Sequence, residues 1–194
     1  MLRTVFTLAI LASILSACDR EYTPKPKAYA RINLPTPSYI MPDTASWSCP
    51  YLFEASRYSY LTIDKRYQNE YCWFNIYYPS LNATIHLTYS TLDDNLGKQI
   101  EDTRKLAMKH VGKATAINER RIENDSAKVY GLTYEFKGET ASDMQFFLTD
   151  SSKHFLRGAL YFNVRPNKDS LDPVIDYVKS DIHHFIETLR WTTP

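Results

Sequence analysis

The spacing of apolar side chains changes twice along this chain of 194 residues, and this change restricts its fold more than any other feature. In residues 83–89 apolar side chains recur at every second position, which is typical of a half-buried strand. In residues 92–111 they recur at every third or fourth position, which predicts a helix that ends before Gly112. A second helical pattern runs from about Ser170 to Arg190 and forms a continuous apolar stripe.

The remaining patterned segments predict strands that are separated by short polar turns. These segments are residues 51–63 (one or two strands), 72–78, 114–122, 128–136, 144–148 and 155–164. The order of strands, helix, strands and helix predicts an α+β fold, with an antiparallel sheet of about six strands and two main helices packed on it. The same order resembles the α/β sandwich of the photosystem-associated PsbP proteins.

The N-terminus has the features of a segment that directs export. Arg3 precedes a short apolar run that ends at Leu15, too short for the roughly 20 apolar residues of a membrane-spanning helix. Leu15-Ser16-Ala17-Cys18 resembles the lipobox of bacterial lipoproteins, in which cleavage precedes the cysteine and acyl chains are attached to it. We therefore expect residues 1–17 to be a signal peptide and Cys18 to be the lipidation site; an ordinary signal peptide with an incidental cysteine is the alternative.

A proline-rich segment follows the lipobox. Residues 19–50 hold six of the ten prolines, which favour extended backbone and exclude it from a sheet interior. We expect residues 18–50 to form a lipidated tether and residues 51–194 to form one globular domain. Tyr39 is one of three tyrosines in the tether that are hard to assign to a core, and these pack along the domain or contact a partner.

The two other cysteines and the net charge limit the functional classes. Cys49 and Cys72 could form a disulfide in an oxidising compartment, and two buried free thiols are the alternative. Removal of Arg3 with the signal peptide leaves 22 basic and 22 acidic residues. This balance provides no basic excess for binding nucleic acid.

The sequence contains no motif that supports catalysis, a metal or a cofactor. His183 and His184 are adjacent on the last predicted helix and point in different directions, so they do not form a metal-binding pair. Ser151 or Ser152 with His154 has the residue types of a hydrolase, but this segment is first a turn between strands. The chain is therefore expected to be non-enzymatic, without cofactor or metal.

Several stretches of the mature chain resemble the gliding motility lipoprotein GldD family. They are Cys18 with residues 22–26, Arg31-Ile32, Pro35, residues 49–51, 53–54 and 85–89, and most distinctly residues 145–167. The resemblance implies a cell-envelope lipoprotein of Bacteroidetes that acts in surface gliding, beside other gliding lipoproteins and the type IX secretion machinery. It implies no catalytic residues.

Together these features predict a non-enzymatic assembly component that is anchored in the cell envelope, in either the inner or the outer membrane. The candidate partner contacts are Lys153, Arg157 and Arg165, within the segment of strongest resemblance. Salt bridges within the sheet are the alternative role for these arginines. A lipoprotein that binds a glycan or another small molecule is the alternative function, and it would require an open aromatic cleft.

Overall fold

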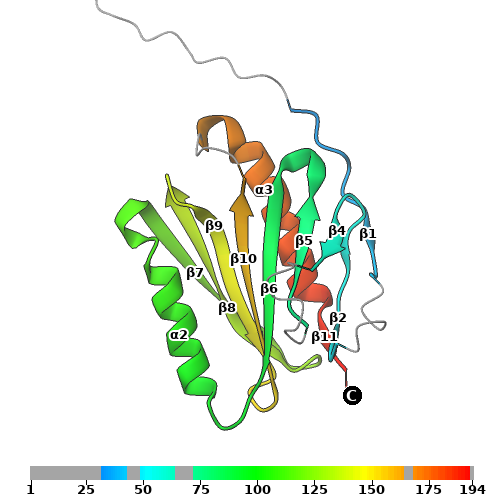
Figure 1. Cartoon of the computed structure of the whole chain (residues 1–194), viewed down its shortest axis with the longest axis vertical. Coiled ribbons are helices and arrows are strands. Elements are labelled where there is room, and N and C mark those ends of the chain that lie inside the picture. Colours follow the sequence, from blue (N-terminus) through cyan, green and yellow to red (C-terminus); the bar gives the residue numbers. More distant parts are fainter. Residues whose placement is uncertain (1–31, 43–48, 64–71, 164–167, 193–194) are drawn as a thin grey trace, which may run out of the picture. The chain divides into compact units, whose positions relative to one another are not determined.

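A seven-stranded antiparallel sheet forms the centre of the chain (Figure 1). The computed structural model describes residues 32–42, 49–63, 72–163 and 168–192, and within 168–170 only the backbone. The strands of the main sheet lie in the order β4-β5-β6-β10-β9-β8-β7. They are β4 (Tyr60–Thr62), β5 (Phe74–Tyr78), β6 (Ala83–Thr91), β7 (Ala114–Asn124), β8 (Val129–Gly138), β9 (Ser142–Thr149) and β10 (His154–Phe162).

Two small antiparallel pairs of strands lie outside the main sheet. β1 (Tyr39–Ile40) pairs with β3 (Ala55–Ser56), and β2 (Tyr51–Leu52) pairs with β11 (Arg190–Trp191). The packed structure therefore begins before the expected boundary at residue 51, because Tyr39 and Ile40 are hydrogen-bonded to a strand of the domain.

Helix α3 (Lys168–Thr188) covers one face of the sheet. Its apolar stripe, including Val178, Ile182 and Phe185, packs against alternate residues of β5, β6, β9 and β10. Phe146 and Phe185 have ring centroids 5.8 Å apart. Gly158 of β10 lies directly beneath the Phe146 ring, where a side chain would collide with it.

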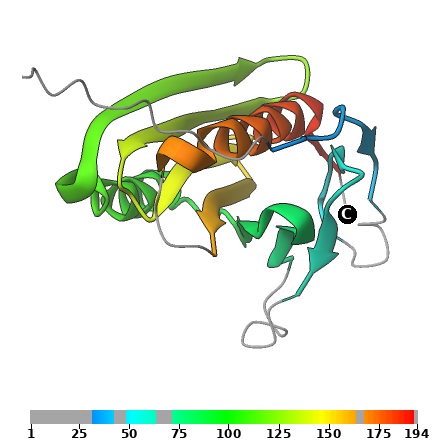
Figure 2. The same ribbon diagram turned by 90° about the horizontal axis from the view of Figure 1, so that it is seen from above.

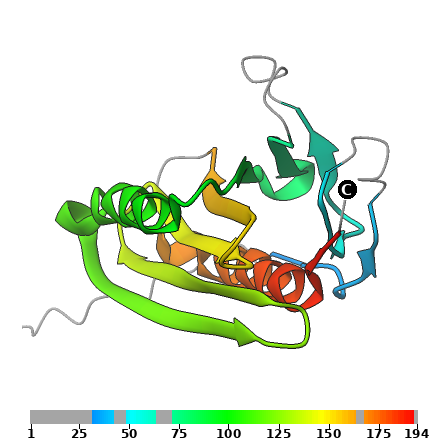
Figure 3. The ribbon, with the colours of Figure 1, turned by 90° about the horizontal axis from the view of Figure 1, so that it is seen from below.

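Helix α2 (Leu96–Met108) covers part of the opposite face. It packs on Phe147 and Phe155 near one end of the sheet and on Tyr134 and Phe136 of β8 towards the other. In Figures 2 and 3 the yellow strand β9 passes between α2 and α3, and all eight of its residues are buried. In β5 and β6, by contrast, every second residue is only half-buried, because no helix covers their α2 side.

The structure confirms the expected α+β fold with an antiparallel sheet and two main helices. The main sheet has seven strands, where about six were expected. Helix α2 begins at Leu96 rather than at residue 92, because Asp94 takes a left-handed backbone conformation (φ 49°) that breaks a helix. In the part of the chain that the structure describes, no helix is long and apolar enough to cross a membrane.

The close approach at Gly158 provides a test of this packing. Gly158→Ala should lower the free energy of unfolding by about 1–3 kcal/mol, because its Cβ would overlap a fully buried phenyl ring. Urea denaturation of both proteins measures the difference. Gly97→Ala is the matched control, since a Cβ at Gly97 of α2 meets no atom within 4 Å and the change should cause no loss. Equal stability of Gly158→Ala and the unaltered chain would contradict the described packing.

Candidate functional site

The side of β5, β6 and β10 that faces away from α3 is an exposed polar surface. In Figure 1, β6 and β5 lie on the far side of β10 from α2, which does not reach them. Alternate residues of these strands are half-buried and point to this side. We call this surface the open sheet face; it consists of Asn75, Tyr77, Thr84, His86, Thr88, Ser90, Arg157 and Tyr161.

The centre of the open sheet face is held by contacts between neighbouring strands. His86 Nδ1 lies 2.7 Å from Asn75 Oδ1, its partner residue on β5. The His86 ring also meets the Tyr161 ring of β10 edge to face, with centroids 5.5 Å apart. None of the eight residues of this face carries a carboxylate, so its one permanent charge is the guanidinium of Arg157.

Arg157 lies in the most enclosed part of this surface. On β10 it is placed between Thr88 of β6 and Phe147 of β9. Its Nε–H is buried and has no hydrogen-bond acceptor, and no described carboxylate forms an ion pair with it. Burial lowers the pKa of Arg157 from its usual value, and a nearby tyrosine, Tyr161, has the opposite effect.

Gln145 of β9 lies next to Arg157 on the same side of the sheet. It pairs with Ala159, two residues along β10 from Arg157, so the two polar side chains are diagonal neighbours across adjacent strands. Gln145 is only 1% exposed, and its Oε1 has no hydrogen-bond partner. Two buried polar groups without partners in one place are unusual, because each costs free energy unless a further molecule satisfies it.

The structure describes two of the three predicted contact residues, and these two differ in exposure. Lys153 is exposed in the turn before β10, whereas Arg157 is half-buried within the sheet. Arg165 lies outside the described residues. The alternative role, a salt bridge within the sheet, is not formed by Arg157 with any described residue.

The segment with hydrolase-like residue types forms a tight turn. Asp150 Oδ1 accepts hydrogen bonds from the backbone N–H of Ser152, Lys153 and His154, at 3.0, 2.8 and 2.8 Å. The Ser152 hydroxyl donates to Asp150 Oδ2, while His154 Nδ1 shares a 2.8 Å hydrogen bond with the Tyr89 hydroxyl. Among described residues no hydrogen bond joins either serine to His154.

A cleft beside this turn is the described cavity that comes nearest to an aromatic binding site. Its volume is about 360 Å³, and its lining includes Lys128, His154 and Trp191. The indole ring of Trp191 stacks on the His154 ring at 5.0 Å, and its Nε1–H donates to the backbone carbonyl of Lys128. One face of the Trp191 ring and its Nε1–H group are therefore already in contact with other residues of the domain.

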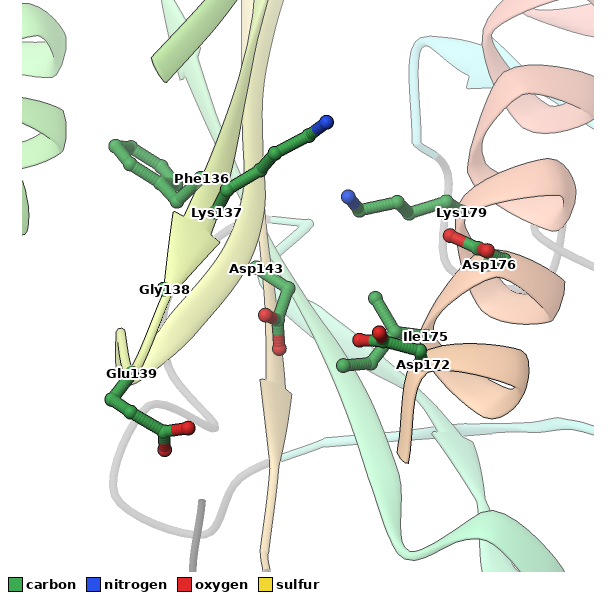
Figure 4. Close-up of a pocket in the computed structure, with 9 residues that line it drawn as sticks. All are labelled: Phe136, Lys137, Gly138, Glu139, Asp143, Asp172, Ile175, Asp176 and Lys179. Atoms are coloured by element: carbon green, nitrogen blue, oxygen red, sulfur yellow. The ribbon is translucent and has the colours of Figure 1, made fainter. Parts of the chain in front are cut away.

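A larger cleft of about 440 Å³ lies between the ends of β8 and β9 and the first turns of α3 (Figure 4). Lys137 and Lys179 extend towards each other across it, and four carboxylates line it, those of Glu139, Asp143, Asp172 and Asp176. Lys179 also forms an ion pair of 3.3 Å with Glu135. No group of residues in the described part of the chain is arranged to hold a metal ion.

A buried aspartate on α3 fastens the N-terminal segment to the domain. The Tyr39 and Tyr78 hydroxyls donate to the two carboxylate oxygens of Asp181, at 3.0 and 3.1 Å. Burial raises the pKa of Asp181, although these hydrogen bonds oppose the change, and burial together with Asp181 raises the pKa of Tyr39 to about 12. The Tyr39 ring stacks on His184 at 3.6 Å, and His184 bonds Glu54 at 2.6 Å.

The structure joins Cys49 to Cys72 in a disulfide, with Cα atoms 5.6 Å apart. The bond links a residue just before β2 to a residue just before β5. The hydroxyl of the buried Tyr51 donates a hydrogen bond to the backbone carbonyl of Cys72. Cys18, the expected lipidation site, lies outside the described residues.

Large apolar side chains are exposed at the edge of the sheet near β1 and β4. They are Ile40, Met41, Tyr58, Tyr60 and Ile63, with Tyr60 64% and Met41 62% exposed. Such clusters are uncommon on proteins that contact nothing else.

The Asp150 turn leads to a pH prediction. Partial burial alone would raise the pKa of Asp150, but the three backbone donors and the Ser152 hydroxyl outweigh it and lower the pKa to about 2, from 3.8. A lowered pKa stabilises the fold above the unfolded value, and this stabilisation is lost as pH falls through the folded value.

Asp150→Asn should therefore be less stable than the unaltered chain at pH 7 by about 1 kcal/mol, because charged acceptors bind N–H groups more strongly. The difference should shrink between pH 4 and pH 2, as measured by thermal unfolding across that range. Asp93→Asn, at an exposed aspartate outside the turn, is the control. A difference that is independent of pH would refute the role assigned to Asp150.

A family profile and a solved structure are similar to this chain. The family profile described as gliding motility lipoprotein GldD matches residues 19–191, which is most of the chain. No curated protein sequence matches. Among solved structures, the solution structure of cyanobacterial PsbP (CyanoP) from Synechocystis sp. PCC 6803 superposes with a TM-score of 0.42 at 12% identity, covering 80% of this chain and 96% of that one. Because the profile spans nearly all of the chain, this protein belongs to the GldD family of gliding motility lipoproteins.

Proposed function

We propose that this protein is a non-enzymatic assembly component of the gliding and type IX secretion machinery, held at a membrane of the cell envelope by acyl chains on Cys18. The observation that carries the proposal is the family match over residues 19–191, which begins at the residue after Cys18. The lipobox-like residues 15–18 supply the attachment point.

The structure supports a binding role more than a catalytic one. The histidines of α3 are engaged with Glu54 and Glu135, and His154 is engaged with Tyr89 and Trp191. Two surface features, the open sheet face and the exposed apolar edge near β4, suit contact with another protein.

The disulfide and the docking of Tyr39 support a position outside the cytoplasm, close to an anchor. Disulfides persist in exported proteins, and Cys49–Cys72 closes a loop of 23 residues at the start of the domain. Tyr39 lies 21 residues after Cys18, and its hydroxyl donates a hydrogen bond to Asp181, so the expected tether contacts the domain at this residue. We expect a force applied at the membrane anchor to be transmitted to the domain through the Tyr39–Asp181 hydrogen bond.

Replacement of the anchoring residue tests this function. Cys18→Ala should abolish incorporation of labelled palmitate, release the protein from the membrane fraction and stop gliding, because two or more acyl chains are needed for stable membrane attachment. Cys49→Ala with Cys72→Ala is the matched control, since it removes the other cysteines and should leave palmitate labelling intact. Continued gliding by a Cys18→Ala strain with normal protein levels would refute the anchored role.

A further inference from the structure

The strongest unexplained feature of the molecule is the pair of polar groups without partners beneath the open sheet face. The Nε of Arg157 and the Oε1 of Gln145 are both buried, and neither makes a hydrogen bond. A partly buried arginine without a counter-charge costs free energy that a native structure normally recovers through a carboxylate or phosphate. The domain supplies no such group to Arg157 among its described residues.

The surroundings of Arg157 indicate which chemistry would satisfy it. The open sheet face contains hydroxyl, imidazole and amide groups and no acidic side chain. Tyr161 adds aromatic surface on the Arg157 strand, and Tyr77 adds more on β5. Tyr and Arg are among the residue types that most often dominate binding energy at protein interfaces. The surface is therefore complementary to a partner that presents negative charge and apolar area together.

We propose that the open sheet face binds an acidic side chain of a partner protein, and that Arg157 receives its carboxylate. The planar guanidinium can donate two parallel hydrogen bonds to one carboxylate. The terminal nitrogens, unlike the buried Nε, are the donors that a partner outside the domain can contact. The partner thus removes the cost of an uncompensated charge.

This inference rests on the proposed assembly role, and it names the chemistry of the contact. The chain has nearly balanced charge, so long-range attraction of an acidic partner is weak. Recognition is expected to depend on the short-range contact with Arg157. It follows that removal of Arg157 should reduce binding without weakening the fold, in contrast to removal of a buried residue that stabilises the domain.

The direct test uses the full-length lipidated protein in nanodiscs of neutral lipid. The Nε–H resonance of Arg157, identified by its loss in Arg157→Met, is followed by NMR during titration with the blocked peptide acetyl-Gly-Glu-Glu-Gly-amide. A saturable shift is expected with this peptide, and affinity for the matched Gln peptide should be about tenfold or more lower, the ratio typical of a charge-assisted hydrogen bond. Absence of a saturable shift, or equal affinity for both peptides, would overturn the proposal.

The control variant is Arg121→Met, which removes an exposed arginine on β7 at the opposite edge of the sheet. It should bind the Glu peptide normally, whereas Arg157→Met should not bind it. Equal loss in both variants would show that bulk charge decides binding, and it would overturn the assignment to Arg157. Two further arms use inorganic phosphate and nanodiscs of anionic lipid; a shift with either of these but not with the Glu peptide would also overturn it.

Stability measurements separate a binding role from a structural one. Arg157→Met should unfold at the same urea concentration as the unaltered protein, or at a higher one, since the substitution removes a charge without a partner. A clear decrease would show that Arg157 stabilises the fold and would overturn the binding role. A negative peptide titration alongside loss of gliding in Cys18→Ala would reject this inference and leave the proposed function in place.

Discussion

The packing of α3 on the sheet is the interaction on which the other features of this domain depend. Its apolar stripe buries alternate residues of four strands, and the absence of a side chain at Gly158 leaves room for the Phe146 ring. The same helix carries Asp181, which binds Tyr39, and it leads into β11, which pairs with β2. One helix thus joins the main sheet, the N-terminal segment and the C-terminus.

This arrangement determines which surface is left exposed. α3 occupies one face along β5, β6, β9 and β10, so cover of the other face depends on α2. Among the described strands α2 packs on β7, β8, β9 and one end of β10. β9 is consequently buried on both sides, while β5 and β6 are buried on one. Arg157 lies at the border between the covered and uncovered parts, which explains why its Nε is buried although the residue as a whole is partly exposed.

Much of this fold could be predicted from the sequence, because strands and helices have different apolar periods. The spacing in residues 83–89 and the stripe from Leu171 to Leu189 led to the correct elements and to the α+β class. Tyr39 was harder to place, since its pairing partner Ser56 and its hydrogen-bond partner Asp181 are distant in sequence and no local pattern predicts either contact. β9 was predicted as a strand, but burial of both its faces depends on the placement of two helices.

The candidate site was predicted only in part. Arg157 was selected because it lies in the segment that resembles the family, although Lys153, selected with it, lies in an exposed turn outside the sheet. Gln145 was missed as a site residue, because a glutamine on an otherwise apolar strand gives no sign of whether its amide is satisfied. The signal that could have suggested it was its polar side chain between the apolar Met144 and Phe146 of a predicted strand.

Photo-crosslinking in gliding cells tests the central claim most directly. A photoreactive residue at Thr88, the β6 neighbour of Arg157, should crosslink to a single envelope protein, and mass spectrometry should map the crosslink within a few residues of an Asp or Glu. The crosslink should disappear when Arg157→Met is added and persist with Arg121→Met. An unchanged crosslink in the Arg157→Met background, or one that maps to a segment without acidic residues, would contradict the account.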